Sequence, residues 1–176
     1  MMEKKTMVEL NRKSQLEYQE AVKIPLKVVL DEVRSMHNVG SVFRTADSFL
    51  LEGIYLCGFT PQPPHRDIQK TALGATETVP WKHYATTIEA LQSLKAEGYV
   101  LLAIEQAHGS VMLQHVELDL TKKYALVFGN EVYGVQQEVI AQCDHVIEIP
   151  QLGSKHSLNI SVSAGIVIWE LAKRFL

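Results

Sequence analysis

Three short segments of the chain combine glycine with polar side chains that could bind a ligand or take part in a reaction. They read HNVGSVFRTADSF (37–49), GNEVYG (129–134) and PQLGSKHSLNIS (150–161), and each comes shortly after a run of branched apolar residues. Such runs are typical of buried strands, and open parallel sheets bind their ligands at the carboxyl ends of strands. The three segments are therefore candidates for a single site.

The first segment presents Asn38, Gly40 and Arg44. Asn38 can cap a following helix, and Gly40 allows another backbone to approach closely. Arg44 lies six residues after Asn38, near the same face of that helix. Taken alone, these residues favour a capped helix that carries a surface arginine.

The other two segments offer a carboxylate, amides and hydroxyl groups. The turn at 129–134 presents Asn130 and Glu131, and its backbone amides could hold a polar ligand, although a simple strand-to-helix turn would look the same. In the third segment, Ser157, Asn159 and Ser161 fall around the first turn of a helix, where N–H groups lack partners. N-capping would explain one of these three residues and leave the others without a role.

Taken together, NVGSVFRT, LVFGNEVYG and IPQLGSKHSLNISVSAGIVIWE resemble, in this order, the three signature motifs of the SpoU/TrmH-type RNA ribose methyltransferases of the SPOUT class. The resemblance covers the chain from about Leu26 to its C-terminus. It implies an α/β domain with a C-terminal trefoil knot, a rare exception to unknotted topology. It also implies S-adenosylmethionine (AdoMet) as cofactor, a tRNA or rRNA substrate and a homodimer that forms through the C-terminal helix.

The resemblance also implies roles for single residues. It assigns catalysis to Arg44, Asn38, Glu131 and Asn159. It places AdoMet against the backbone around Glu105, Gln106, Gly129, Ile149, Ser157 and Leu158. The reaction would be in-line attack of a ribose 2′-oxygen on the methyl group of AdoMet. Because a guanidinium normally stays protonated, we expect Arg44 to bind the substrate phosphate and stabilise the developing alkoxide, with Glu131 orienting Arg44 or Asn38.

The elements that must position these residues alternate along the chain. Runs of branched apolar residues predict strands at 26–30, 53–58, 99–105, 124–129 and 145–149. Helical patterns lie near 38–51, 86–97 and 136–141. Because the strands are apolar on both faces, the pattern predicts an α/β fold with a mostly parallel sheet flanked by helices.

Three further stretches complete the organisation. Residues 1–25 read as an N-terminal arm with a weakly amphipathic helix over 3–22, and residues 26–176 as the catalytic domain. The connection from Thr60 to Tyr84 reads as a long irregular loop in which Trp81 and Tyr84 form a small core cluster or, less favoured, stack on a base. The helix from about Ser157 to Leu176 has no polar face, which favours burial at a subunit interface.

The composition narrows the classes of function. The net charge of −3 argues against a protein that holds nucleic acid by bulk charge alone, although basic residues gather locally. These local groups are Lys4, Lys5, Arg12 and Lys13, then His65, Arg66 and Lys70, then Lys122 and Lys123, then Lys155 and His156. Cys57 and Cys143 stand apart without metal-ligand spacing, so no zinc site is expected. The sequence shows neither a membrane span nor a signal peptide, which predicts a cytoplasmic protein.

Several alternatives stay open at this stage. The chain could be an inactive AdoMet- or RNA-binding factor associated with the ribosome, or it could methylate a base instead of a ribose. A doubly wound oxidoreductase is disfavoured because no GxGxxG follows the first strand. No separate RNA-binding domain is expected before Leu26 or after Leu176, so RNA selection would use the arm, the 60–84 loop and the dimer surface.

Overall fold

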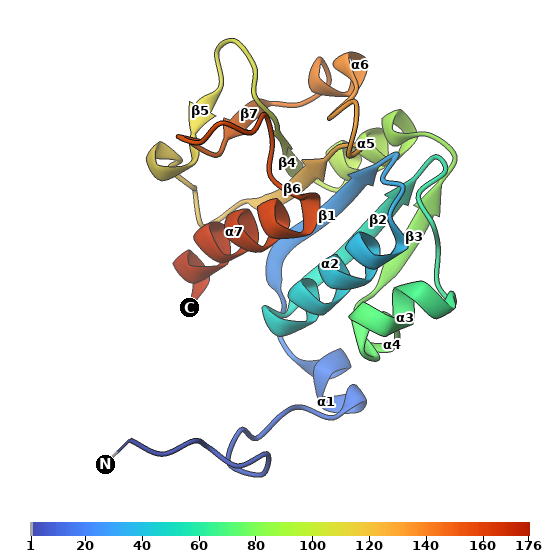
Figure 1. Ribbon diagram of the computed structural model, residues 1–176, viewed down its shortest axis with the longest axis vertical. Coiled ribbons are helices and arrows are strands. Elements are labelled where there is room, and N and C mark those ends of the chain that lie inside the picture. The colour runs from blue at the N-terminus through green and yellow to red at the C-terminus, as the bar shows by residue number, and fades with distance from the viewer. Residues whose placement is uncertain (1) are drawn as a thin grey trace.

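A computed structural model describes residues 2–176, which form one seven-stranded sheet between two layers of helices (Figure 1). The strands run in the order β3-β2-β1-β6-β4-β7-β5, and each pair of neighbours is parallel. Their bounds are β1 (Ile24–Asp31), β2 (Leu51–Cys57), β3 (Trp81–Tyr84), β4 (Tyr99–Ile104), β5 (Val111–Met112), β6 (Lys123–Phe128) and β7 (His145–Glu148).

The helices cover both faces of this sheet. They are α1 (Gln15–Glu20), α2 (Met36–Ser48), α3 (Arg66–Ala72), α4 (Ala75–Thr78), α5 (Thr87–Ala96), α6 (Gln137–Ile140) and α7 (Ile160–Ala172), with 3-10 turns at Leu113–His115 and Lys173–Phe175. One core cluster lies under α2 and α7, and a second lies under α5 and α6. In β1, Val28 faces the first cluster and Val29 the second, so this strand is buried on both sides.

The predicted α/β class and the mostly parallel sheet are confirmed. All five predicted strands are present, with bounds that differ by up to two residues, and β3 and β5 join them at the sheet edges. The predicted irregular loop from Thr60 to Tyr84 is wrong, because this stretch holds α3, α4 and β3. Left-handed backbone at Leu73 and Gly74 separates the two short helices, so the frequent glycine and proline residues mark element ends.

Trp81 and Tyr84 belong to β3 and pack into the two core clusters. The Tyr84 ring lies 4.9 Å from the ring of Tyr55, centroid to centroid. The expected packing role of each residue is therefore confirmed, but the expected small cluster formed by the pair is wrong, because the two side chains lie on opposite faces of the sheet.

The N-terminal stretch is less helical than predicted. Only α1 forms, and Ser14 begins it with a capping box in which Glu17 returns the hydrogen bond. Asn11 has left-handed backbone geometry, which breaks the predicted helix over 3–22 before this point. Buried Tyr18 attaches α1 to the first core cluster.

Two contacts fix the position of α2. A Cβ atom built on Gly40 would lie within 3.0 Å of the Ile68 carbonyl oxygen, Thr71 Oγ1 and the Ala72 backbone nitrogen, so α3 packs directly on the backbone of α2. On the other side, Phe49 just after α2 contacts Trp169 of α7, with ring centroids 5.7 Å apart. The close approach predicted at Gly40 is confirmed.

Candidate active site

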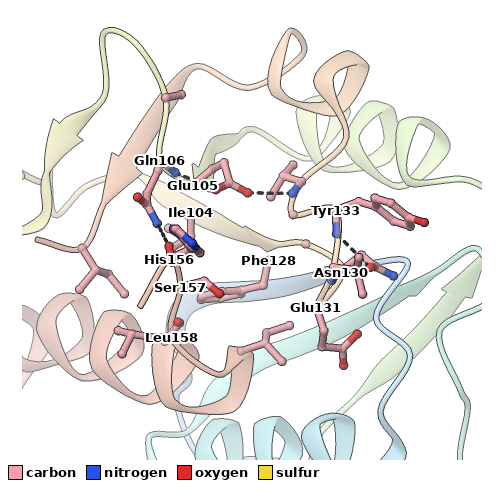
Figure 2. Close-up of a pocket in the computed structure, with 18 of the residues that line it drawn as sticks. Ile104, Glu105, Gln106, Phe128, Asn130, Glu131, Tyr133, His156, Ser157 and Leu158 are labelled. Carbon is pink, nitrogen blue, oxygen red and sulfur yellow. Dashed lines mark hydrogen bonds between the residues drawn. The ribbon is translucent and has the colours of Figure 1, made fainter. Parts of the chain in front are cut away.

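A cavity of about 860 Å³ opens at the carboxyl ends of β4, β6 and β7 (Figure 2). Its walls come from residues 104–108, 128–137 and 149–160, three loops that are far apart in sequence. All six positions predicted to hold the cofactor line this one cavity: Glu105, Gln106, Gly129, Ile149, Ser157 and Leu158.

Two polar side chains after β4 tie the three loops together. The Glu105 carboxylate accepts hydrogen bonds from the Val135 backbone N–H at 3.0 Å and from the Gln106 backbone N–H at 2.8 Å. The Gln106 side chain donates to the carbonyl oxygen of His156 at 2.7 Å, and both links are visible in Figure 2. The cavity walls are thus joined before any ligand enters, so the site is largely preformed.

The loop after β6 is organised around Asn130. Its side-chain oxygen accepts from the backbone N–H groups of Val132 at 2.9 Å and Tyr133 at 3.2 Å, while its amide donates to the Glu32 carbonyl at 2.6 Å. Asn130 is buried although it belongs to the cavity lining. Its side chain makes three hydrogen bonds that close the turn.

Gly134 completes this turn. Its backbone φ is +68°, and it exchanges backbone hydrogen bonds with Asn130. A Cβ atom there would meet the Glu105 carboxylate. Glycine is therefore required both by the backbone conformation and by the neighbouring loop.

Glu131 turns away from this loop toward the start of α2. Its carboxylate accepts hydrogen bonds from the backbone N–H groups of Arg34 at 2.9 Å and Ser35 at 3.0 Å, and from the Asn38 side-chain amide at 3.0 Å. Burial alone would raise the pKa of Glu131, but these hydrogen bonds outweigh it and hold the pKa below its ordinary value of 4.5. An ionised Glu131 thus fixes the orientation of Asn38.

The geometry of α2 corrects two expectations. Ser35, and not Asn38, is the N-cap, because its side chain accepts from the Asn38 backbone N–H. Asn38 lies on the buried side of the helix, whereas Arg44 is exposed, so the two do not share a face. Within residues 2–176, Arg44 is not among the cavity-lining residues, and the Glu131 carboxylate is bound to Asn38 and not to Arg44.

Asn159 lies at the cavity wall and begins α7 as its N-cap. Its side-chain oxygen accepts hydrogen bonds from the Ser161 backbone N–H at 2.9 Å and from the Ser161 hydroxyl at 2.6 Å. N-capping therefore explains the placement of Asn159 and the hydrogen bonds that it accepts from Ser161. It does not explain Ser157, which lies at the cavity wall.

Sequence reasoning missed two exposed apolar residues at the cavity, Val132 and Tyr133. Their side chains are 66% and 84% exposed although they follow the Glu131 carboxylate directly. The sequence signal that could have indicated Val132 and Tyr133 is their position inside a polar turn bounded by glycines, where large apolar side chains are unusual.

None of the helices in the described part of the chain combines the length and hydropathy that a bilayer crossing needs.

Comparison with known proteins agrees with this geometry. The model of the SpoU rRNA Methylase family matches residues 25–169. The chain is 31% identical over 150 residues to a 23S rRNA (guanosine-2'-O-)-methyltransferase RlmB from Neisseria meningitidis, covering 85% of this chain and 59% of that protein. It is 30% identical over 149 residues to the tRNA (guanosine(18)-2'-O)-methyltransferase of Escherichia coli, covering 85% of this chain and 63% of the relative.

Solved structures show the same fold. An AdoMet-bound rRNA methyltransferase from Sinorhizobium meliloti superposes with a TM-score of 0.80 at 30% identity, over 94% of this chain and 62% of that one. A TrmH/SpoU tRNA modifying enzyme from A. aeolicus also gives a TM-score of 0.80, at 28% identity, over 91% of this chain and 80% of that one. The family match spans most of the chain and includes all three loops of the cavity, and the chain therefore belongs to the SpoU rRNA methylase family.

Proposed function

We propose that this protein transfers a methyl group from AdoMet to a ribose 2′-hydroxyl of tRNA or rRNA. The observation that carries the proposal is the single cavity formed by the three motif-bearing loops of a SpoU family member. Two relatives named as guanosine 2'-O-methyltransferases, one acting on 23S rRNA and one on tRNA, support ribose as the acceptor.

The cavity suits AdoMet in size and in lining. Cofactor sites usually enclose about 300–1,000 Å³ with apolar walls and a few placed polar groups. Here Ile104, Phe128 and Leu158 supply apolar surface, and the loop backbones around Gln106 and Gly129 supply polar groups. When bound, AdoMet supplies an electrophilic methyl group, because its sulfonium centre becomes a neutral thioether, a good leaving group, when the methyl group is transferred.

The protein residues would then align the reactants and help to remove one proton. The exposed Arg44 guanidinium binds an RNA phosphate beside the reacting ribose and stabilises the oxygen as it loses its proton. That proton passes to the bound phosphate or to another nearby group while the new O–CH3 bond forms. Glu131 keeps Asn38 in place by their hydrogen bond, and Asn159 fixes the start of α7 next to the cofactor loop.

We further propose a homodimer that forms through α7. Val162, Ile166 and Trp169 are 50%, 38% and 48% exposed, and their spacing places them on one side of the helix. Such an apolar strip is typical of an interface. The loop before α7 would be threaded as a trefoil knot, and the protein would act in the cytoplasm. The expected boundary after residue 25 falls inside β1, so the arm outside the catalytic domain would comprise the residues before Ile24.

Comparing RNA from a deletion strain with RNA from its parent tests the activity. Nuclease digestion and mass spectrometry should show one 2′-O-methylated nucleoside that disappears in the deletion strain. A missing base methylation would favour the base methyltransferase alternative, and no missing modification would favour an inactive binding factor.

Arg44→Ala tests the assignment of the arginine. The variant should lose methyl transfer by about 100-fold or more while binding AdoMet with wild-type affinity, because a transition-state contact is lost outside the cavity. Lys95→Ala, which removes an exposed cation from α5 on the other face of the sheet, is the matched control and should keep full activity. An active Arg44→Ala enzyme would remove Arg44 from the mechanism.

A further inference from the structure

Exposed basic side chains lie on α2, at the start of and along α3, and in the turn before α2. We call them the basic strip, and it consists of Arg34, His37, Arg44, His65, Arg66 and Lys70. Figure 1 shows α3 lying next to α2 on the face of the sheet opposite α5. The strip therefore joins residues that are separated by up to 36 positions in the sequence.

Direct contacts connect the two helices that carry the strip. Thr71 of α3 donates a hydrogen bond to the His37 carbonyl oxygen at 2.9 Å, and Gly40 lets the two helices touch along their backbones. The Asp67 carboxylate accepts a hydrogen bond from the Lys70 ammonium at 2.5 Å, which is the main cause of its lowered pKa. The backbone N–H of Asp67 donates to His65 Nδ1 at 3.1 Å, so Lys70 and His65 both contact this residue of α3.

The strip begins at the cavity. The backbone N–H of Arg34 donates to the Glu131 carboxylate, which belongs to the cavity wall. From His37, the exposed side of α2 leads to Arg44, seven residues and about 10 Å further along the helix axis. Arg66 and Lys70 are exposed on α3, which packs on α2 through Ile68, Thr71 and Ala72.

The basic strip is positively charged, whereas the whole chain carries a net charge of −3. Arg34, Arg44 and Arg66 are permanent cations, and Lys70 already pairs with Asp67, the acid within the strip. Arginine forks and lysine ammonium groups that share an exposed surface bind phosphate oxygens well. A group of exposed cations on neighbouring elements favours the binding of a polyanion from solvent.

We propose that the basic strip is the surface on which the RNA backbone docks, with Arg66 and Lys70 holding phosphates next to the nucleotide that Arg44 addresses. This inference rests on the proposed function, because it identifies where the substrate of the same site lies. It goes further in assigning RNA recognition to α3, which contributes nothing to the cavity itself.

A charge-reversed pair tests the proposal without touching the site. Arg66→Glu/Lys70→Glu leaves Asn38, Arg44 and Glu131 unchanged. Lys95→Glu/Lys122→Glu makes the same change of charge at two exposed lysines outside the strip and is the matched control. The milder Arg66→Ala/Lys70→Ala protein guards against a folding defect, and thermal melting of all proteins checks that they are folded.

The probes are bulk tRNA and total rRNA from a strain that lacks the gene. Binding is measured from about 50 to about 200 mM salt, and AdoMet affinity is measured by calorimetry. We expect the strip variant to bind RNA about tenfold or more weakly at low salt and to bind AdoMet normally. The slope of log Kobs against log salt should fall in magnitude by about 2, or about 1 for each lost phosphate contact.

Three results would overturn the proposal. If the strip variant binds RNA like the wild type, or if the control pair loses as much affinity, α3 is not the docking surface although the proposed function can still hold. If the wild-type protein itself binds neither RNA pool, the proposed function fails and the docking surface fails with it.

Discussion

Gly40 of α2 offers a sharp test of how the site is positioned. In Gly40→Ala, the added methyl group would lie within 3.0 Å of the Ile68 carbonyl oxygen, Thr71 Oγ1 and the Ala72 backbone nitrogen. Thr71 can rotate, but the atoms of Ile68 and Ala72 belong to the backbone of α3. The two helices therefore have to separate.

Two opposing terms set the size of the effect. Alanine favours a helix interior over glycine by about 1 kcal/mol, whereas overpacking a tight contact costs about 1–3 kcal/mol. Because two of the clashes involve backbone atoms, we expect an overpacking cost near the upper end of this range. The free energy of unfolding should therefore fall by about 1–2 kcal/mol. For a chain of 176 residues this lowers Tm by roughly 2–8 °C, at about 2–4 °C for each kcal/mol.

Urea unfolding of Gly40→Ala measures this loss, with Ser41→Ala as its control. Ser41 is the next residue of α2 and is only half-buried, so its replacement should raise stability by about 0.5 kcal/mol through helix propensity. In Gly40→Ala, methyl transfer should fall more than AdoMet affinity, because α2 carries Asn38 and Arg44 but does not line the cavity. A Gly40→Ala protein as stable as the wild type would refute the packing argument.

Three further predictions concern the loops of the site. The pKa of Glu131 is lowered in the folded protein, so its stabilisation is complete above its ordinary pKa of 4.5 and is lost as pH falls through the lower folded value; acid melts of Glu131→Gln should lack this loss. Gly134→Ala should weaken AdoMet binding about tenfold by calorimetry, because its φ is +68° and its Cβ meets Glu105, whereas Gly109→Ala, with φ of +80° and open space, should bind normally. Asn159→Ala should cost about 1 kcal/mol in urea unfolding, since the cap of α7 is lost, and unchanged stability would contradict that role.

The sequence predicts the sheet well where the strands are apolar on both faces. β1 and β6 lie in the middle of the sheet, and their continuous apolar runs distinguish them from helices. β3 was missed because it has only four residues and Lys82 and His83 interrupt its two aromatic residues, and β5 was missed because two residues give no pattern. Edge strands are specified by their neighbours more than by their own residues.

The site shows a similar division. Because the motifs follow strands of one parallel sheet, sequence could indicate which loops meet, and the structure brings those loops to one cavity. It could not indicate which way single side chains point. Asn130 is buried because Glu32, far away in sequence, accepts its hydrogen bond, and α2 begins at Ser35 because Glu131 holds the preceding turn. Such contacts exist only in the folded chain.

The strand order also determines when the sheet can close during synthesis. Val28 of β1 pairs with Ile54 of β2 on one side and with Leu126 of β6 on the other. As the chain leaves the ribosome, β1, β2 and β3 are complete long before β6 is made, so one edge of β1 has no partner during that interval. Unpaired strand edges are templates for association between chains, and such long-range pairing forms slowly. A nascent or truncated chain that ends before Lys123 should therefore aggregate readily, and chaperones would have to protect this edge of β1.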